Sequence, residues 1–412
     1  MKNITKLLGL LLLFSAFAMT VSAPVQAKKD FTVSTSSKPY KNKYVKNPVY
    51  NKYTKHYLTL RSYLDEMSKK GGGTLTIKKG TYNISNALLV PSNVKIVLQD
   101  GVVMNKIGNS HTKKLKAGHV MFECVRSSRI NKKGVVGKYN GEKNIQIIGE
   151  GTVIMNLSGC NKSEVPHCKN VLIDNITFTN LRDGHFIEVT ASKDVTVQNC
   201  TFKNNLSGER CAINLDTPDK VTNGFNGKYS KFDKTPVLNV TIQNCGFYNL
   251  HRGIDTHRFS PNKYHTNVQI LGCTFKDSVQ SPIMMLNWKN AVIKGNTIDT
   301  VKGWSTNNIQ KEKFAIYMRG GVIDPIISEN RMNGVYMPFY AKGHKEAAGD
   351  IAARYAATYN SISAASIESM KNNILGDNCI LRYFAINRKG TLYIAKSEKH
   401  YDKYYIEPVQ AQ

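Results

Sequence analysis

Acidic, basic and imidazole side chains recur at matched positions in short strand-like segments of the central chain. The segments begin at Phe186, Ala212, Gly253, Pro282 and Ala315. Their third residues are Glu188, Asn214, Asp255, Met284 and Tyr317, and their fifth residues are Thr190, Asp216, His257, Leu286 and Arg319. Because side chains alternate across a strand, third and fifth residues share the face opposite to the inward second residue. If the segments stack, these polar side chains form one exposed patch.

Two aspartates of this patch have a spacing that suits acid–base chemistry. Stacked neighbours lie about 5 Å apart and diagonal neighbours about 7–8 Å apart. This places Asp216 beside His257 and diagonal to Asp255. A carboxylate separation of about 6.5–9.5 Å suits an inverting glycosidase, which uses one acid, one base and a water. We therefore expect Asp216 and Asp255 to be catalytic, with the imidazole of His257 orienting and tuning Asp216.

The other polar residues of the patch are expected to bind substrate. They are Glu188, Arg210, Asn214, His251, Arg252, Arg258 and Arg319. Arginines can hold carboxylates or sulfates through paired hydrogen bonds. Hydrolysis by this set needs no cofactor and no metal. Two alternatives stay open: the acids could hold Ca²⁺ in a lyase, or the column could be a structural ladder without chemistry.

A repeated unit would bring these segments together. Related tetrapeptides start at 170, 194, 239, 267 and 290; the starts at 170 and 194 lie 24 residues apart, 239 and 267 lie 28 apart, and 267 and 290 lie 23 apart. Each unit continues with Asn or Gly, which accept a left-handed bend, in the column Asn175, Asn199, Asn244, Gly272 and Gly295. Periods of this length without an intervening helix indicate a β-solenoid. We predict an all-β parallel β-helix, preceded by a capping helix over 57–69.

Two interior columns follow from the same alignment. Cys200, Cys245 and Cys273 occupy one column, and Phe178, Phe202, Phe247 and Phe275 occupy another. We expect the cysteines to be small buried hydrophobic residues rather than metal ligands. Cys160 and Cys168 flank a polar loop and could form a disulfide.

The opening coil and the later rungs resemble those of the pectin-lyase-like superfamily. The residues that carry this resemblance are GGTLTI at 72–77, KGTY at 79–82 and NALLVPSNV at 86–94, and the resemblance covers roughly residues 70–335. It implies a right-handed parallel β-helix and a function among polysaccharide lyases, polygalacturonases and phage depolymerases. Asn214-Leu215-Asp216 matches the Asn-x-Asp of polygalacturonases, which implies that Asp216 is the general acid. The paired aspartates, Gly-His-Gly and Arg-x-Lys of that family are incomplete here.

Four segments are expected along the chain. Residues 1–27 have the basic start, apolar run and small-residue end of a signal peptide. Residues 28–56 form a solvated Lys/Tyr-rich linker, 57–343 the parallel β-helix, and 344–412 the C-terminal coils or a cap that begins with a helix over 345–357. The insertion over 217–238 is expected to be a cleft wall or lid. The protein is then secreted, extracellular or cell-wall associated, with no transmembrane segment after signal cleavage.

The charge balance points to a polyanionic partner. The 57 Lys and Arg residues against 29 Asp and Glu give a net charge of +28, and no nucleic-acid motif accompanies them. The basic linker could lie on an anionic cell-wall polymer. The leading hypothesis is a secreted enzyme that cleaves an acidic, uronate-containing polysaccharide, with hydrolysis favoured over elimination. The alternative is a non-catalytic glycan- or cell-wall-binding β-helix surface protein.

Overall fold

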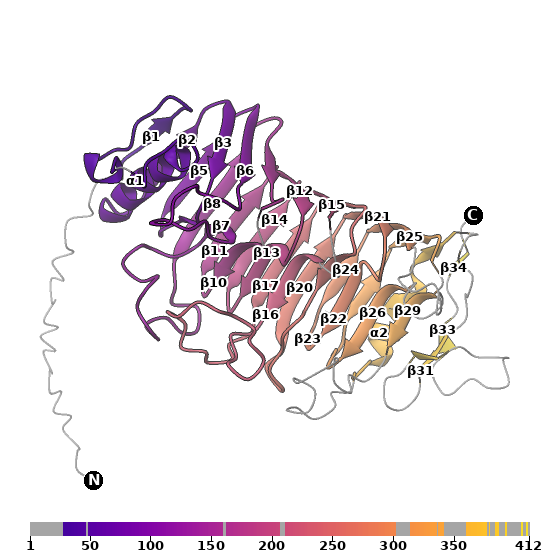
Figure 1. Ribbon diagram of the computed structural model, residues 1–412. Helices are drawn as coiled ribbons and strands as arrows, with labels where there is room; N and C mark the ends of the chain where they lie inside the picture. Colours follow the sequence, from indigo (N-terminus) through magenta and orange to yellow (C-terminus); the bar gives the residue numbers. More distant parts are fainter. Residues whose placement is uncertain are drawn as a thin grey trace, which may run out of the picture.

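The computed structural model describes most of the chain between residues 28 and 379 (Figure 1). The described residues are 28–46, 48–159, 162–206, 211–301, 314–335, 337–341, 360–376 and 379, with short strands beyond. The expected signal peptide, Arg210 and the expected helix over 345–357 lie outside them.

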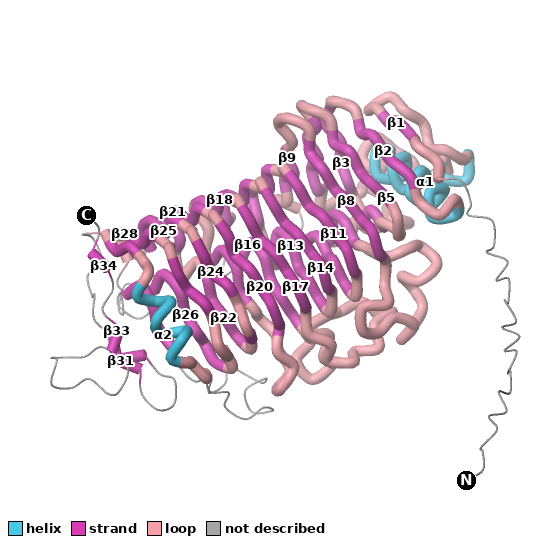
Figure 2. The backbone as a smooth tube through the Cα atoms, turned by 180° about the vertical axis from the view of Figure 1, so that it is seen from behind, coloured by secondary structure: helices cyan, strands magenta, loops and turns pink. Residues whose placement is uncertain are grey.

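Three parallel sheets form the walls of a coil that runs the length of the molecule (Figures 1 and 2). Sheet A has the order β1 (Phe31–Val33), β2 (Gly73–Ile77), β5 (Val94–Leu98), β8 (Lys143–Gly149), β11 (Lys169–Asp174), β14 (Lys193–Gln198), β17 (Leu238–Gln243), β20 (His265–Leu271), β24 (Val292–Lys294) and β27 (Ile326–Ser328), with β23 (Trp288–Lys289) also beside β20. Sheet B has the order β3 (Gly80–Ile84), β6 (Val102–Lys106), β9 (Ile154–Asn156), β12 (Thr177–Leu181), β15 (Thr201–Asn205), β18 (Gly246–Tyr248), β21 (Thr274–Ser278), β25 (Thr297–Val301), β28 (Arg331–Asn333), β30 (Ile374–Leu375) and β34 (Val409–Gln410).

Sheet C carries the segments in which we expected the functional site. Its order is β4 (Leu88–Leu89), β7 (Val120–Glu123), β10 (Lys162–Pro166), β13 (His185–Thr190), β16 (Cys211–Asp216), β19 (Arg252–Asp255), β22 (Ile283–Leu286), β26 (Phe314–Gly320) and β29 (Met337–Ala341). Outside the three sheets lie η1 (Asn42–Tyr44), α1 (Lys55–Lys69), α2 (Ala364–Lys371) and an antiparallel set of β31 (Phe384–Ile386), β32 (Leu392–Tyr393) and β33 (Tyr405–Ile406). None of the helices among the described residues has the length and apolar character needed to cross a membrane.

The interior columns lie where the repeat predicted them. Phe178, Phe202, Phe247 and Phe275 are stacked, with successive ring centroids 5.0, 5.0 and 4.6 Å apart. The three cysteines of the neighbouring column are buried free thiols. Cys168 is also a free thiol whose Sγ lies 3.1 Å from the carbonyl oxygen of Pro166. Cys168 thus forms no disulfide, and Cys160, its expected partner, lies outside the described residues.

The predicted bends are also present. Asn175, Asn199, Asn244, Gly272 and Gly295 all have φ between 52° and 68°. This left-handed backbone is the conformation that asparagine and glycine accept most readily. A regular bend in each coil keeps successive strands in register, so that equivalent side chains lie above one another.

The N-terminal segment is not the solvated linker that we expected. Phe31–Val33 pairs in parallel with Gly73–Ile77 and covers the first edge of sheet A. The rings of Phe31, Tyr40 and Tyr63 form an edge-to-face cluster with centroids 5.1–5.7 Å apart. The aromatic residues between the lysines thus pack on the first coil, while the lysine side chains reach solvent. The segment is part of the cap that covers the open end of the solenoid.

Candidate functional site

The predicted column of sheet C is confirmed by the strand register. Glu188 pairs with Asn214, Asn214 with Asp255, Asp255 with Met284, and Met284 with Tyr317. The isoleucines one position earlier point into the core and are buried, as expected: Ile187, Ile213, Ile254, Ile283 and Ile316. Strand alternation therefore places the candidate residues on the outer face of this sheet.

The carboxyl groups of this face are buried rather than exposed. Glu188 is 4% exposed, Asp216 3% and Asp255 1%. We expected an open patch, but the insertion after β16 covers it. Phe225 and Tyr229 of this insertion pack in a small core with Leu89, Val125 and Val136. The insertion is therefore a wall with its own hydrophobic anchor.

A pocket of about 370 Å³ opens between this wall and sheet C. It is lined by Gly184, His185, Glu188, Asp216, Asn223, Gly224, Phe225, Asn226, His257 and Arg258. Of the expected site residues, Glu188, Asp216, His257 and Arg258 therefore meet in one cavity. The rings of His185 and His257 lie edge to face with centroids 6.2 Å apart.

Asp216 is held by backbone groups of the next coil. Its Oδ1 accepts hydrogen bonds from the N–H groups of His257, at 3.0 Å, and Arg258, at 2.7 Å. Burial, and then the neighbouring carboxylate of Glu188, raise the pKa of Asp216 well above its usual value, although these hydrogen bonds oppose the rise. His257 thus orients Asp216 through its main chain, and its side chain is exposed. The structure thus shows a contact through the backbone N–H of His257, where we had expected one through its imidazole.

Asp255 lies on the same face but is held in ion pairs. Its Oδ2 lies 2.5 Å from Arg252 Nη1, and its Oδ1 lies 3.9 Å from Arg319 Nη1. Asp255 does not line the pocket. The two arginines thus neutralise a buried carboxylate instead of presenting both guanidinium groups to substrate. These ion pairs do not support a role of Asp255 as a general acid or base.

The strand register at Arg319 differs from the expected one. An irregularity after Met285 pairs Leu286 with Gly320, so the expected pairing of Leu286 with Arg319 is wrong. Asn214 is fully buried, and its Oδ1 accepts a hydrogen bond from the N–H of His257. His251 is buried at the bend before Arg252–Asp255. Neither residue lines the pocket.

Two further acids extend the column and were missed in the sequence. Glu123 pairs with Glu164, and Glu164 pairs with Glu188, on three successive strands of sheet C. The hydroxyl of Tyr229 donates a hydrogen bond of 2.8 Å to Glu123 Oε1. The sequence pattern that could have revealed these two acids was weak, because Lys162–Pro166 lies in a polar stretch and pairs irregularly with Val120–Glu123. Among the described residues, no three His, Cys, Asp or Glu side chains are placed to hold one metal ion.

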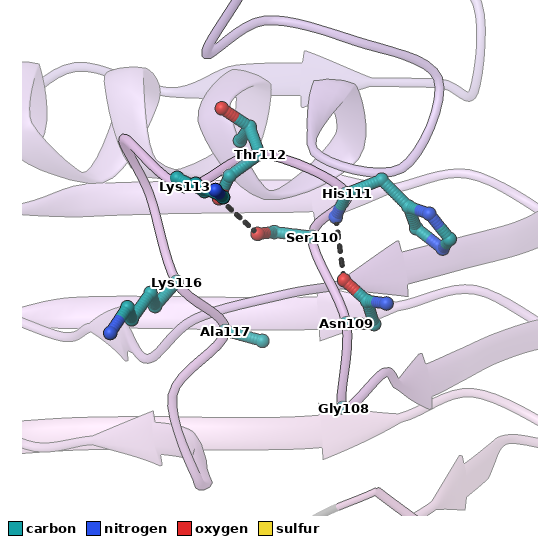
Figure 3. A pocket seen from close by; sticks show the side chains of 8 residues that line it. All are labelled: Gly108, Asn109, Ser110, His111, Thr112, Lys113, Lys116 and Ala117. Atoms are coloured by element: carbon teal, nitrogen blue, oxygen red, sulfur yellow. Dashed lines mark hydrogen bonds between the residues drawn. The ribbon is translucent and has the colours of Figure 1, made fainter.

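Two other hollows lack a pair of carboxyl groups. One of about 450 Å³ is formed by the loop at 108–117, where His111, Lys113 and Lys116 are the titratable side chains (Figure 3). Another of about 520 Å³ lies at the N-terminal edge of sheet A, with Asp30 as its single acid. Of these three hollows in the described part of the chain, the acidic pocket beside Glu188 and Asp216 is therefore the candidate active site.

Comparison with known proteins agrees with this architecture. Residues 125–299 match the family model described as a right handed beta helix region. The fold is a right-handed parallel β-helix. No curated protein sequence matches the chain. The family match and the three parallel sheets together confirm the predicted fold class.

Solved β-helix structures with different functions resemble the chain. PfbA, a surface adhesin of Streptococcus pneumoniae, matches in one structure with TM-score 0.57 and 17% identity over 78% of this chain and 77% of that chain. A second PfbA structure gives 0.55 and 18% over 77% and 84%. A galactohydrolase named for a sulfated galactose polymer gives 0.46 and 12% over 94% and 88%. The neighbours thus include an adhesin and a polysaccharide-degrading enzyme.

Proposed function

We propose that the protein cleaves a polysaccharide by hydrolysis in the pocket beside sheet C. The observation that carries this proposal is the pair of buried carboxyl groups, Glu188 and Asp216, in one open cavity. They stand on neighbouring strands in diagonal positions, because Glu188 pairs with Asn214 and Thr190 with Asp216. Diagonal neighbours lie about 7–8 Å apart, a spacing that suits an inverting glycosidase.

Asp216 is assigned as the general acid. Its raised pKa keeps the proton on the carboxyl group at a pH where an exposed aspartate has lost it. Because Oδ1 is occupied by two backbone N–H groups, Oδ2 is the oxygen that carries the proton to the leaving sugar. Glu188 is assigned as the carboxylate that activates water on the other side of the bond.

An acidic, uronate-containing polymer is the proposed substrate. Arg258 lines the pocket beside the two acids and could bind a substrate carboxylate. His185 and His257 add hydrogen-bonding groups at the same rim. The net charge of +28 supports attraction of a polyanion over longer distances. We propose that the protein acts outside the cell, after removal of residues 1–27.

The second candidate function is glycan binding without cleavage. The observation that favours it is the burial of both carboxyl groups, at 4% and 3% exposure. Proton transfer requires the substrate to approach these carboxyl groups closely. A sugar bound only at the rim of the pocket would stay too far from them. Under this alternative, the pocket is the binding site of a surface protein.

One experiment separates the two candidates. The protein is incubated with uronate polymers, and new reducing ends and the ultraviolet absorbance of unsaturated uronate are recorded together with polymer retention. Reducing ends without that absorbance indicate hydrolysis, and reducing ends with it indicate elimination. Retention with neither signal supports binding only.

Substitution of either acid should remove turnover and preserve binding. We expect Asp216→Asn and Glu188→Gln each to lower kcat by about 10²–10⁴-fold, because each removes one proton-transfer step. Asp299→Asn, on sheet B and away from the pocket, is the matched control and should leave kcat unchanged. Full turnover in Asp216→Asn would show that the acid is assigned wrongly.

A further inference from the structure

We propose that a lysine-rich surface beside the pocket binds an extended acidic polysaccharide. The basic surface, as we define it, comprises Lys132, Lys133, Lys138, Lys143, Lys169, Lys193, Lys228 and Lys231. It combines the first residues of three sheet A strands with two loops that lie side by side. The inference rests on the proposed function only for the chemical class of the polymer.

The first part of the basic surface is a stack of like charges. Lys143 pairs directly with Lys169, and Lys169 pairs directly with Lys193. Strands lie about 4.7–4.9 Å apart, and like charges in directly opposed positions destabilise a sheet. Lys193 also lies 3.8 Å from the exposed carboxylate of Asp194. An anionic ligand along this column would relieve the repulsion.

The second part of the basic surface lies on two loops that are joined by backbone hydrogen bonds. Val136 forms a parallel bridge with Ser230, and the N–H of Lys231 donates to the carbonyl oxygen of Val136 at 2.7 Å. The N–H of Gly134 donates to the carbonyl oxygen of Lys228 at 3.0 Å. These bonds bring Lys132 and Lys133 close to Lys228. The loops are visible beside β10 and β16 in Figure 1.

The two parts are continuous. The Nζ atom of Lys193 lies 5.9 Å from the ring centroid of Tyr139, which follows Lys138 in the first loop. The hydroxyl of Tyr139 donates to the carbonyl oxygen of Pro236 in the second loop, at 3.0 Å. The column and the loops therefore form one surface rather than separate groups of lysines.

The three acids of the two loops already have hydrogen-bond or ion-pair partners, and Asp233 lies within the basic surface itself. Glu142 is buried and forms ion pairs with Arg126 and Arg129. Asp219 is buried and forms an ion pair with Lys234. Asp233 accepts a hydrogen bond from the backbone N–H of Lys138, at 2.6 Å. Apart from Lys193, the lysines of the basic surface form no ion pair within the described part of the chain.

The arrangement fits a linear acidic sugar polymer better than a nucleic acid. Asn223–Asn226 line the acidic pocket, and Lys228 follows two residues later on the same loop. A chain with one sugar in the pocket can therefore continue over the lysines. The carboxyl, imidazole and amide groups that line the pocket can form hydrogen bonds with sugar hydroxyls, which fits a sugar unit at that point. The ammonium group of each lysine is a compact single charge that can pair with one carboxylate of such a polymer.

The test measures binding of polygalacturonate at low salt in an Asp216→Asn background, so that no polymer is cleaved. The first variant adds Lys143→Gln, Lys169→Gln and Lys228→Gln. The control adds Lys38→Gln, Lys43→Gln and Lys46→Gln, three exposed lysines of the N-terminal segment with the same total charge. We expect about tenfold weaker binding in the first variant only, the ordinary scale for three exposed charge contacts, and a shallower dependence on salt.

Several outcomes would overturn the proposal. Equal weakening in both variants would mean that net charge alone attracts the polymer, and weakening only in the control would move binding to the N-terminal segment. Equally tight binding of a DNA duplex, lost in the same first variant, would make the ligand class wrong. Wild-type turnover is measured separately. Binding sensitive to the first variant without any turnover would support this surface and contradict the proposed function, whereas turnover with insensitive binding would do the reverse.

Discussion

A buried carboxyl group beside a second one makes the protein sensitive to pH. The raised pKa of Asp216 means that the native state keeps a proton that the unfolded chain releases above about pH 4. Stability therefore falls as the pH rises from there through the folded-state pKa. Asp216→Asn removes this titration but keeps an oxygen that can accept from His257 and Arg258. We expect the free energy of unfolding of the variant, relative to the wild type, to increase between about pH 4 and pH 8.

Denaturant unfolding of both proteins at a series of pH values measures this difference. Asp299→Asn serves as the control, because no comparable burial surrounds that carboxyl group. A difference that stays constant with pH would mean that Asp216 titrates as an ordinary aspartate, which would also weaken its assignment as the general acid.

The ion pairs of Asp255 predict a structural role for this residue. Removing the carboxylate in Asp255→Ala leaves the guanidinium groups of Arg252 and Arg319 without their buried partner. We expect a loss of about 1.5–3 kcal/mol in the free energy of unfolding, the range for hydrogen bonds to charged groups. Denaturant titration measures the loss. Unchanged stability with abolished turnover would instead make Asp255 the catalytic residue that its spacing first suggested.

The sequence predicted which residues share a face but not how each one is used. Strand alternation and the repeat placed Glu188, Asn214 and Asp255 in one column, because backbone hydrogen bonds enforce that register. His257 lies beyond the end of Arg252–Asp255, where the chain turns, so alternation no longer fixes the direction of its side chain. The ion pairs of Asp255 depend on side-chain conformations that no repeat encodes.

At the scale of elements, one glycine controls the shape of the pocket wall. A Cβ atom on Gly224 would lie 1.9 Å from the carbonyl oxygen of Thr217, so any side chain there must displace the wall. We expect Gly224→Ala to abolish turnover or weaken glycan binding while the coil stays folded. Gly108→Ala is the matched control, because nothing lies within 4 Å of its Cβ position and its φ is not positive.

Circular dichroism and binding assays on the two variants measure these effects. Gly108→Ala should behave as the wild type in both. If Gly224→Ala also binds and turns over normally, the insertion is a tolerated surface segment and does not shape the site.

Elements inside the repeat were predictable, and elements outside it were not. The bends at Asn175 and Asn199 and the phenylalanine stack follow from local sequence, because each coil repeats the same contacts. The contact between the loops at Val136 and Ser230 joins residues far apart in the chain without any periodic signal. The buried position of the two acids was missed for this reason.

At the scale of the molecule, the N-terminal segment protects an open sheet edge. Phe31–Val33 covers the edge of Gly73–Ile77, which would otherwise present unpaired backbone groups. We expect removal of residues 28–54 to lower the melting temperature and to cause self-association. Light scattering and thermal unfolding measure these changes. If the shortened protein is a monomer with an unchanged melting temperature, the segment is a dispensable tail and does not protect the sheet edge.

The stacked lysines at positions 143, 169 and 193 have one more consequence. Their separation along the solenoid is set by main-chain hydrogen bonds between the strands, which lie about 4.7–4.9 Å apart. The spacing between neighbouring lysines is therefore constant, and the length of the lysine column changes only when a whole coil is gained or lost. If this surface binds a polysaccharide as proposed, proteins with more or fewer coils in this region would contact a different number of sugar units, with the same spacing between contacts.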